Sequence, residues 1–471
     1  NIRVEGRQSD MTQIEPSRMT PAASAARRST ERLTPSGPTA VTAHTGISGR
    51  AAARPASGSS TIAMTKIYDQ MQSYSMVAIP MFVLMANFLT HSKVADGLFE
   101  SIRYLLGPLK GGLGLAVILV STVFAATTGI VGASVVTMGM LSLPVLLRSG
   151  YKPSLACGMV CAGGSLGILI PPSMLMILFA WAANVSVLGC FIATVIPGIL
   201  LVCLLSITQG FLYKKGIGGS RAVSFTDNII EDAKQKEALK AEAEAAKSLK
   251  KGKKHGESAI PALLMPVIIL GSIYTGWLTA TEAAALSVLY AIPIGVLYYK
   301  KLDWKTYKVA MIDAGKTAGV IMAMTLTVQI LSRLYMTENL PDLLLGFLTS
   351  ISSNKYVILL MINLFMVVMG MLMDDCSNTI LLTPILLPIM QALGVSTLHF
   401  AAILGVNIGM GNITPPTAPL LYLSGRITGS QVKNMLKPTL ILIVCAWLPT
   451  LIITTYWQGF AEFLPKLLGY L

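Results

Sequence analysis

Charged residues are scarce in this chain of 471 residues: Asp, Glu, Lys and Arg make up only 12%, whereas hydrophobic residues make up 53%. Between Pro153 and Tyr213 the sequence contains no Asp, Glu, Lys, Arg or His. A typical soluble domain carries about twice that share of charge. The uncharged stretch is also long enough for two or more membrane crossings of roughly 20 residues each. The composition therefore predicts a multi-pass membrane protein.

The sequence also lacks the alternating pattern of membrane β-strands. Every span is expected to be helical, because hydrocarbon offers no hydrogen-bond partner to an open strand. The predicted fold class is therefore an all-α polytopic membrane protein. We expect apolar segments at membrane depth, several of them double, near 74–91, 112–148, 154–212, 261–299, 318–335, 355–394, 398–425 and 437–459.

The net charge of +14 comes largely from polar breaks between apolar segments. Eleven Lys and Arg residues lie in 214–257, and five Lys residues lie in 300–316. Two helices, 261–279 and 281–299, are expected between these breaks, so both breaks should lie on one face of the membrane. The excess of Lys and Arg makes that face cytoplasmic. We therefore predict no nucleic-acid partner.

Several chemistries have no sequence signal. The six cysteines all lie in apolar segments, and Cys157 and Cys161 share a helix face without His or acidic neighbours, which favours small buried hydrophobic side chains over a metal cluster or a disulfide. The phosphate-loop pattern GxxxxGK[ST] does not occur, which argues against ATP-driven transport by this chain. An intramembrane aspartyl protease needs two facing aspartates on separate helices, but Asp374 and Asp375 are adjacent. The chain is predicted not to be an enzyme.

Residues 1–63 contain no Lys and no aromatic residue, and they hold eight of the thirteen arginines. This composition cannot form a packed core. Three interpretations stay open: a segment read out of frame or mis-joined, a disordered tail, and an organelle transit peptide. The predicted organisation is this segment, a first membrane repeat (64–213), a charged cytoplasmic linker (214–258), a second membrane repeat (259–436) and a C-terminal membrane helix (437–471).

A displacement of 244 positions superimposes helix-breaking residues of the two halves. Gly167, Pro171 and Pro172 fall on Gly411, Pro415 and Pro416, and each proline pair is followed by a hydroxyl residue, Ser173 or Thr417. Pro144 and Gly150 also fall on Pro388 and Gly394. Five matched breakers without a gap indicate two homologous halves. Interrupted segments at corresponding places are the best sequence pointer to a transporter's substrate and ion site.

Each half has a second interruption upstream of its proline pair. TTGIVGAS (127–134) breaks the first half, with Gly129, Gly132 and Ser134, and this serine could cap a new helix. MDDCSNT (373–379) breaks the second half. We interpret both as re-entrant helical hairpins whose turns leave carbonyls for Na⁺ and a positive helix end for a carboxylate.

The proline pairs lack N–H groups, so carbonyls one turn earlier lose their helical partners. A bound cation would satisfy them; a pair of packed proline kinks is the alternative. Neutral oxygens for the ions would come from Ser134, Ser173, Ser377, Asn378, Thr379, Thr414 and Thr417, with Gly129, Gly132, Gly167 and Gly411 shaping the turns. Among these, Ser134, Ser173, Asn378 and Thr417 are expected to contact substrate as well.

The sequence resembles the large membrane (permease) subunit, DctM-like, of tripartite ATP-independent periplasmic (TRAP) transporters over roughly residues 66–471. The stretches that carry the resemblance are SYSMVAIPMFVLMANFL (73–89), TTGIVGASVVTMGMLSLPVLLRSGY (127–151), GGSLGILIPPS (163–173), IPGILL (196–201), LTATEAAALSVLYA (278–291), LLTPILLPIMQALGV (381–395) and GNITPPTAPL (411–420). Members of the family begin with further apolar helices ahead of the AIPMF segment, and these are not found in 1–63.

The resemblance implies an elevator-type transporter of the bacterial inner membrane, driven by Na⁺ as coupling ion, with no cofactor. Its partners would be a small four-helix membrane subunit, a periplasmic binding protein that delivers an organic acid, and the lipid bilayer. One ion site would pair the tip around Ser134 with Ile170 to Ser173. The other would pair Ser377 to Thr379 with Gly411 to Thr417. A stand-alone sodium/dicarboxylate symporter and a channel remain as alternatives.

Two acidic features have two interpretations each. Asp374 and Asp375 could act in a hairpin tip, because carboxylates at membrane depth are functional by default, or could form a solvated turn. Glu282 is expected to belong to a helix start capped by Thr279 or Thr281 rather than to carry protons.

Overall fold

The computed structural model describes residues 68, 74–106, 111–215 and 260–470, all within the compact unit 57–471. The predicted segment 1–63 and nearly all of the predicted linker 214–258 lie outside the described residues. Within them every regular element is a helix, joined by short turns. Six helices are long and apolar enough to cross a membrane, or seven if the bent pair α2 and α3 counts as one span. The coarse prediction of a multi-pass helical membrane protein is confirmed.

Most helices of the first half coincide with the predicted apolar segments, but α3 falls between the predicted segments 74–91 and 112–148. The segment 154–212 divides into three α-helices, because the proline pair interrupts it once and a turn at 184–186 interrupts it again. In order, the elements are α2 (Tyr74–His91), α3 (Val94–Leu106), α4 (Gly112–Thr128), α5 (Val131–Arg148), α6 (Pro153–Gly164), the 3₁₀ turn η1 (Ser165–Ile168), α7 (Met174–Ala183) and α8 (Val187–Lys214).

The second half follows the same scheme with additions at each end. Its elements are α10 (Ile260–Tyr274), α11 (Ala280–Pro293), the π turn η2 (Ile294–Tyr298), α12 (Trp304–Thr337), α13 (Leu340–Ile351), α14 (Lys355–Leu372), α15 (Asp375–Ala392), α16 (Thr397–Gly411), α17 (Pro419–Thr428), α18 (Val432–Leu442), the π turn η3 (Ile443–Trp447), α19 (Leu448–Tyr456) and α20 (Gln458–Leu467).

The displacement of 244 positions also relates helix boundaries. It carries α5 onto α15 at both ends, the first residue of α6 onto that of α16, and the last residue of α4 onto that of α14. Gly150 and Gly394, which correspond, both have positive φ after their helices. The peptide bonds Pro171–Pro172 and Pro415–Pro416 are both cis.

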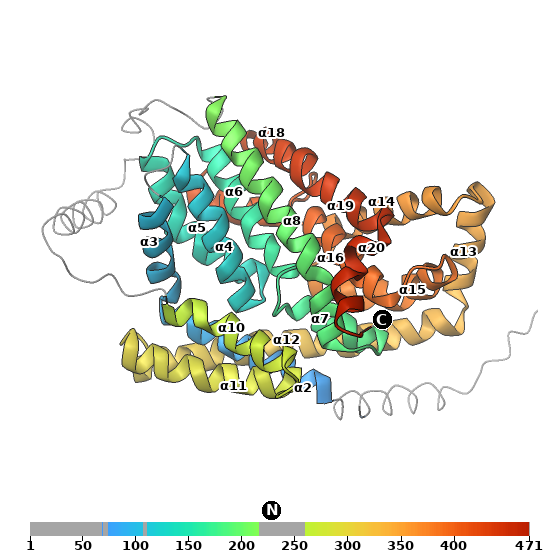
Figure 1. The fold of residues 1–471 in the computed structure, drawn as a ribbon, viewed down its shortest axis with the longest axis horizontal. Coiled ribbons are helices and arrows are strands. Elements are labelled where there is room, and N and C mark those ends of the chain that lie inside the picture. The colour runs from blue at the N-terminus through green and yellow to red at the C-terminus, as the bar shows by residue number, and fades with distance from the viewer. Residues whose placement is uncertain (1–67, 69–73, 107–110, 216–259, 471) are drawn as a thin grey trace, which may run out of the picture. The chain divides into compact units, whose positions relative to one another are not determined.

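The centre of this unit is formed by α6 and α16, the helices that lead into the proline pairs. Every residue from Leu155 to Gly164 and from Leu398 to Gly411 is buried. Around them, α4 and α5 pack on α6, and α14 packs on α16, whereas α2 packs on α11 and α12 along one side (Figure 1). The two interrupted helices are therefore held inside the protein, where freed backbone groups are shielded from lipid.

The helix start at TATEAAA behaves as predicted. The Thr279 side chain accepts a hydrogen bond from the Glu282 backbone N–H at 3.3 Å, and the Glu282 carboxylate accepts one from the Thr279 N–H at 2.8 Å. This is a capping box, which satisfies two N–H groups at the start of α11. Thr279, not Thr281, is the cap.

Candidate functional site

The turn between α4 and α5 lies directly against the first proline break. Gly129 ends α4 with φ of 63°, a left-handed conformation that favours glycine. A Cβ atom built on Gly129 would lie 3.0 Å from the Pro172 carbonyl oxygen and 3.4 Å from the Met174 nitrogen. Glycine is therefore needed here both for the turn and for the close approach of two backbones.

The first proline break is buried apart from Ile170, which is half-buried. Helical structure stops after Ile168 and resumes at Met174. Pro171 and Pro172 cannot donate to the carbonyls four residues earlier. Ser173 precedes α7, yet its hydroxyl makes no capping bond, and its buried Oγ has no hydrogen-bond partner. An unpaired buried hydroxyl costs about 1–3 kcal/mol, so this oxygen is suited to a ligand.

Ser134 does not cap α5, and that expectation was wrong. The cap position is Ile130, four residues earlier, and it makes no side-chain capping bond. The Ser134 Oγ donates instead to the Ile130 carbonyl at 2.9 Å and lies 2.7 Å from Thr128 Oγ1. A serine one turn inside a helix reaches the carbonyl four residues back. The first backbone N–H groups of α5 therefore have no side-chain cap. They lie near the hydroxyls of Thr128 and Ser134.

The turn between α14 and α15 separates the roles of its two aspartates. The Asp374 carboxylate caps α15, since its Oδ2 accepts hydrogen bonds from the N–H groups of Cys376 at 3.1 Å and Ser377 at 3.2 Å. The Asp375 carboxylate accepts a hydrogen bond from the side chain of Asn412, in the second proline break. Asp374 therefore holds the helix start, and Asp375 ties the turn to the break.

Backbone contacts join the second turn and the second break as well. A Cβ atom on Gly411 would lie 2.7 Å from the Gly370 Cα atom, so α14 and α16 touch through two glycines. The Thr417 hydroxyl donates to the Met371 carbonyl. Asn378 lies fully buried near the start of α15, and both polar atoms of its side chain lack a hydrogen-bond partner.

The remaining predicted residues make local contacts that leave the hydroxyl oxygens able to accept a cation. The hydroxyls of Thr379 and Thr414 donate to the carbonyls of Asp375 and Met410, each within its own turn of chain. The Ser377 hydroxyl points toward α12, where it lies 3.7 Å from the Met324 sulfur. Gly132 has open space around its Cβ position, so packing does not require glycine there.

Sequence reasoning missed the glycine and the asparagine that join the α14–α15 turn to the second proline break; we call this turn and break the second assembly, and the α4–α5 turn with the first break the first assembly. Gly370 lies outside the MDDCSNT stretch, and Asn412 was passed over inside GNITPPT. A signal existed for the first: the displacement of 244 positions pairs Gly370 with Ala126, next to Ala125, whose side chain would lie 3.1 Å from a Cβ atom on Gly167. Small residues thus face both breaks.

The two breaks are neighbours. The turn η1 packs against α16, where a Cβ atom on Gly405 would lie 3.1 Å from the Leu169 side chain and one on Gly409 would lie 3.6 Å from Ile168. The breaks differ in exposure, since the first is buried and Pro416 and Thr417 in the second are exposed. Within the described residues no three His, Cys, Asp or Glu side chains gather into a metal-binding group. Neutral oxygens and backbone carbonyls are thus the main cation ligands that these two neighbouring breaks provide.

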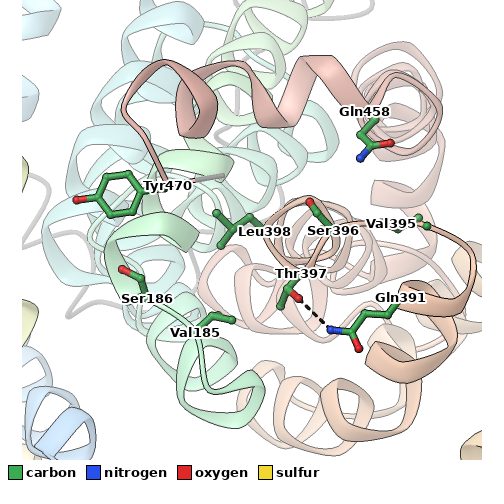
Figure 2. A pocket seen from close by; sticks show the side chains of 10 residues that line it. Val185, Ser186, Gln391, Val395, Ser396, Thr397, Leu398, Gln458 and Tyr470 are labelled. Atoms are coloured by element: carbon green, nitrogen blue, oxygen red, sulfur yellow. Dashed lines mark hydrogen bonds between the residues drawn. The ribbon is translucent and has the colours of Figure 1, made fainter.

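A separate cavity of about 600 Å³ lies away from both breaks. It is lined by the α7–α8 turn, the α15–α16 turn and the C-terminal segment, and includes Ser186, Thr397 and Tyr470 (Figure 2). In Figure 2 the Gln391 amide reaches Thr397, with a distance of 3.2 Å. Since neither proline pair lines this cavity, we keep the candidate site at the breaks.

Glu462 holds the helix α20 beside this cavity through an ion pair and hydrogen bonds. Its buried carboxylate lies 2.8 Å from Lys466 Nζ and accepts hydrogen bonds from Ser396 and, at 2.8 Å, from Gln458. Burial raises the pKa of Glu462, but the hydrogen bonds from Lys466, Ser396 and Gln458 outweigh it and set the pKa below its usual range. This carboxylate therefore has a structural role at the C-terminal end.

Comparisons with known proteins agree with the geometry. The family model described as "Tripartite ATP-independent periplasmic transporter, DctM component" matches residues 41–460. The chain is 30% identical over 404 residues to the C4-dicarboxylate TRAP transporter large permease protein DctM of Pseudomonas aeruginosa, covering 86% of this chain and 89% of that protein.

Two further relatives are named for other solutes. The sialic acid TRAP transporter large permease protein SiaM of Vibrio cholerae is 29% identical, with 84% of this chain and 88% of the relative covered. The isethionate TRAP transporter permease protein DctMQ of Oleidesulfovibrio alaskensis is 30% identical, with 83% and 58% covered. Among solved structures, the YdaH transporter of Alcanivorax borkumensis shares the fold with a TM-score of 0.62 at 17% identity, covering 87% of this chain and 90% of that chain.

Proposed function

The chain belongs to the DctM family of tripartite ATP-independent periplasmic transporters. We propose that it imports an organic anion and that a Na⁺ gradient drives this import. It is a large permease subunit and not an enzyme, so the aspartyl protease alternative is removed. The proposal concerns what the family match leaves open: the coupling ion, the mechanism and the solute.

One observation carries the proposal: in each half, a helix turn meets the proline break of the same half. Gly129 lies against Pro172, and Asp375 and Met371 bind Asn412 and Thr417. A packed proline kink needs no such partner. A turn and a break that face each other bring freed carbonyls and helix starts together, which is the arrangement that binds ions in transporters.

The unpaired oxygens support a small hard cation. Ser173 Oγ and Asn378 Oδ1 are both buried without partners, one in each assembly. Oxygen ligands without a net charge, with backbone carbonyls freed by proline, suit Na⁺. We propose one Na⁺ between Gly129, Gly132, Ser134, Gly167, Ile170 and Ser173, and another between Ser377, Asn378, Thr379, Gly411, Thr414 and Thr417.

The solute is proposed to be an organic anion. The relatives are named for C4-dicarboxylates, sialic acid and isethionate, which share a negatively charged acid group. The helices α5, α7, α15 and α17 all begin at the turns or breaks, and helix N-termini favour negative charge. Ser134, Ser173, Asn378 and Thr417 would contact the anion, and Ser173 and the Asn378 amide have N–H or O–H groups free to donate to it.

The proposed architecture is two structural repeats, each with a re-entrant hairpin (α4–α5, α14–α15) and an interrupted helix (α6–α7, α16–α17). The matching helix boundaries support it. These eight helices would form the mobile body of an elevator in the bacterial inner membrane. The remaining helices would form the scaffold, working with a small four-helix subunit and a periplasmic binding protein.

Uptake into proteoliposomes tests the function. The vesicles would hold this chain with its small subunit, and the binding protein and a labelled C4-dicarboxylate, sialic acid or isethionate would be added outside. We expect saturable uptake of one solute that stops when Na⁺ is replaced by K⁺ or when the binding protein is omitted. Unchanged uptake in K⁺ would defeat sodium coupling, uptake without the binding protein would favour a stand-alone symporter, and uptake that does not saturate would favour a channel.

A serine pair sharpens this test. Ser173→Ala should raise the Na⁺ concentration for half-maximal uptake by roughly fivefold to tenfold, the equivalent of one oxygen ligand worth about 1–1.5 kcal/mol. Ser92→Ala is the control, because Ser92 Oγ is equally buried and unpaired but faces Gly295 in the turn η2. Equal shifts in both variants would refute a role for Ser173.

A further inference from the structure

An apolar groove of about 230 Å³ lies between α13, α14 and α15. All eight side chains that line it are apolar, among them Phe347 of α13, Met361 and Phe365 of α14, and Leu386 of α15. Phe347 and Phe365 are 60% and 43% exposed, so the groove opens outward. It lies apart from both proline breaks and has no part in the proposed transport site.

The start of α14 marks the headgroup level of the membrane. Tyr356 and Tyr456 lie 5.9 Å apart by ring centroids, the Tyr456 hydroxyl donates to the Tyr356 carbonyl at 3.2 Å, and the neighbouring Trp457 is exposed. Tyr and Trp gather where the hydrocarbon meets the headgroups. Ile362, in the groove, lies seven residues beyond Lys355, roughly 10 Å along the helix. Since the headgroup layer is about 5–8 Å thick, the groove lies at acyl-chain depth.

Contacts near the start of α14 show which leaflet of the membrane Lys355 faces. A Cβ atom on Gly394, after α15, would lie 3.8 Å from Lys355 Nζ. The side chain of Leu398, the second residue of α16, would lie 3.1 Å from a Cβ atom on Gly189 at the start of α8. The other end of α8 is Lys214, where the Lys-rich segment begins. Lys355 therefore faces the leaflet opposite the predicted cytoplasmic side.

Lys355 brings a positive charge to the mouth of this region. No carboxylate among the described residues forms an ion pair with it at 4 Å or less. Lys355 is the first residue of α14, where the helix dipole adds positive potential. Lys355 is half-buried, which is typical of a lysine whose stem packs on protein and whose ammonium reaches the surface.

We propose that the groove and Lys355 together form a binding site for an anionic glycerophospholipid of the outer leaflet. One acyl chain lies in the groove, and the phosphate lies at the Lys355 ammonium. A helix of a partner protein is about 10 Å wide and does not fit so small a groove. The combination of apolar lining, depth and one unpaired cation fits a lipid, and this inference does not depend on the proposed transport function.

Fluorescence quenching by brominated lipids tests the site. Phe347→Trp would place the reporter in the groove, and Leu364→Trp is the control, because Leu364 is 66% exposed on α14 but does not line the groove. Both variants would be placed in vesicles of dibrominated phosphatidylglycerol mixed with phosphatidylcholine. They would also be placed in vesicles of phosphatidylglycerol mixed with dibrominated phosphatidylcholine. The quenching of the parent chain, which has five tryptophans, would be subtracted.

We expect phosphatidylglycerol to bind near Trp at position 347 roughly fivefold more strongly than phosphatidylcholine, and the two lipids to be equal at position 364. Adding Lys355→Gln should remove the preference at position 347. Equal binding of both lipids at both positions, or a preference that survives Lys355→Gln, would overturn the proposal. If Phe347→Trp does not yield a monodisperse protein, Leu344→Trp reports on the same groove.

Discussion

Two buried asparagines show how differently the same side chain is used. Asn363 of α14 donates to Thr455 Oγ1 at 3.0 Å, and its carbonyl oxygen accepts from Asn407 Nδ2 at 2.9 Å. Asn378 of α15 is equally buried, but neither end of its amide has a partner. Burying an amide without partners is unfavourable, so an unpaired one suggests a ligand. The first asparagine joins three helices, and the second is free to bind.

Replacement of each asparagine by leucine should therefore have opposite effects. Asn378→Leu should leave the thermal unfolding midpoint in Na⁺-free buffer unchanged or higher, since no hydrogen bond is lost, and should reduce the rise in midpoint on adding Na⁺ to the part that the first site contributes. Asn363→Leu should lower stability by about 1–3 kcal/mol, because Asn407 and Thr455 lose their partner, and should keep the response to Na⁺. Thermal unfolding with and without Na⁺ measures both effects.

The reverse pattern would count against Asn378 as an ion ligand. If Asn378→Leu destabilises the Na⁺-free protein as much as Asn363→Leu does, its amide has a structural partner. If it keeps the full Na⁺ response, the second ion site lies elsewhere.

Residue-scale chemistry was partly predictable. The Thr279–Glu282 capping box follows from neighbouring residues alone. The roles of Asp374 and Asp375 do not follow from the sequence, because both carboxylates lie at the start of the same helix and only the position of Asn412 distinguishes them. Ser134 was assigned to the wrong hydrogen bond because the sequence did not show where α5 begins.

Among the helices, α14 and α16 approach each other closely at a point where each carries a glycine. Any side chain at Gly411 would meet the backbone of Gly370 at 2.7 Å, and backbone cannot move as a flexible side chain does. This contact holds the turn after α14 against the break after α16. The glycine in GNITPPT is thus explained by a helix contact as well as by chain bending.

Gly411→Ala should separate α14 from α16 and destabilise the protein by about 1–3 kcal/mol, the usual cost of overpacking. Gly319→Ala is the matched control, since it lies inside α12 with nothing within 4 Å of its Cβ position. It should be neutral or stabilising by about 0.5–1 kcal/mol, because alanine is the better helix former. The thermal unfolding midpoints, with Na⁺-driven uptake alongside, compare the two; equal midpoints would contradict the close contact.

The extent of an element was harder to predict than its existence. The sequence predicts an apolar segment over 318–335, but α12 runs from Trp304 to Thr337. Lys305, Lys308 and Lys316 end the apolar window, yet they do not end the helix, because they are exposed along it. Hydropathy reports where lipid contacts a helix, and it does not report where hydrogen bonding stops.

Across the whole protein, the proposed elevator divides the helices into a mobile body and a scaffold. The Ser377 hydroxyl of α15 lies 3.7 Å from the Met324 sulfur of α12, so this contact crosses the proposed boundary. The Cys157 sulfur of α6 lies 3.4 Å from Thr428 Oγ1 of α17, and this contact stays within the mobile body. A cross-link at the first contact would join the mobile body to the scaffold, whereas a cross-link at the second would join two parts of the mobile body.

Cross-linking across the boundary should stop transport. Met324→Cys with Ser377→Cys, in a Cys376→Ser background and joined by a short bis-methanethiosulfonate reagent, should reduce Na⁺-driven uptake to background, with recovery after dithiothreitol. The control joins native Cys157 to Thr428→Cys and should keep most uptake, because both residues would move together. Full uptake by completely cross-linked 324–377 protein would contradict motion of α15 along α12.

Composition and local pattern by themselves determined that this chain is a helical multi-pass membrane protein, that its helices break at two matched proline pairs, and which family it resembles. These depend on burial preference and on the missing N–H of proline, which act within a few residues. Only the tertiary structure decided that Gly129 meets Pro172, that Gly370 meets Gly411, that Asp375 binds Asn412, and that the second break is more exposed than the first. Such pairings join residues far apart in the chain, and they depend on how whole helices pack, which no local pattern encodes.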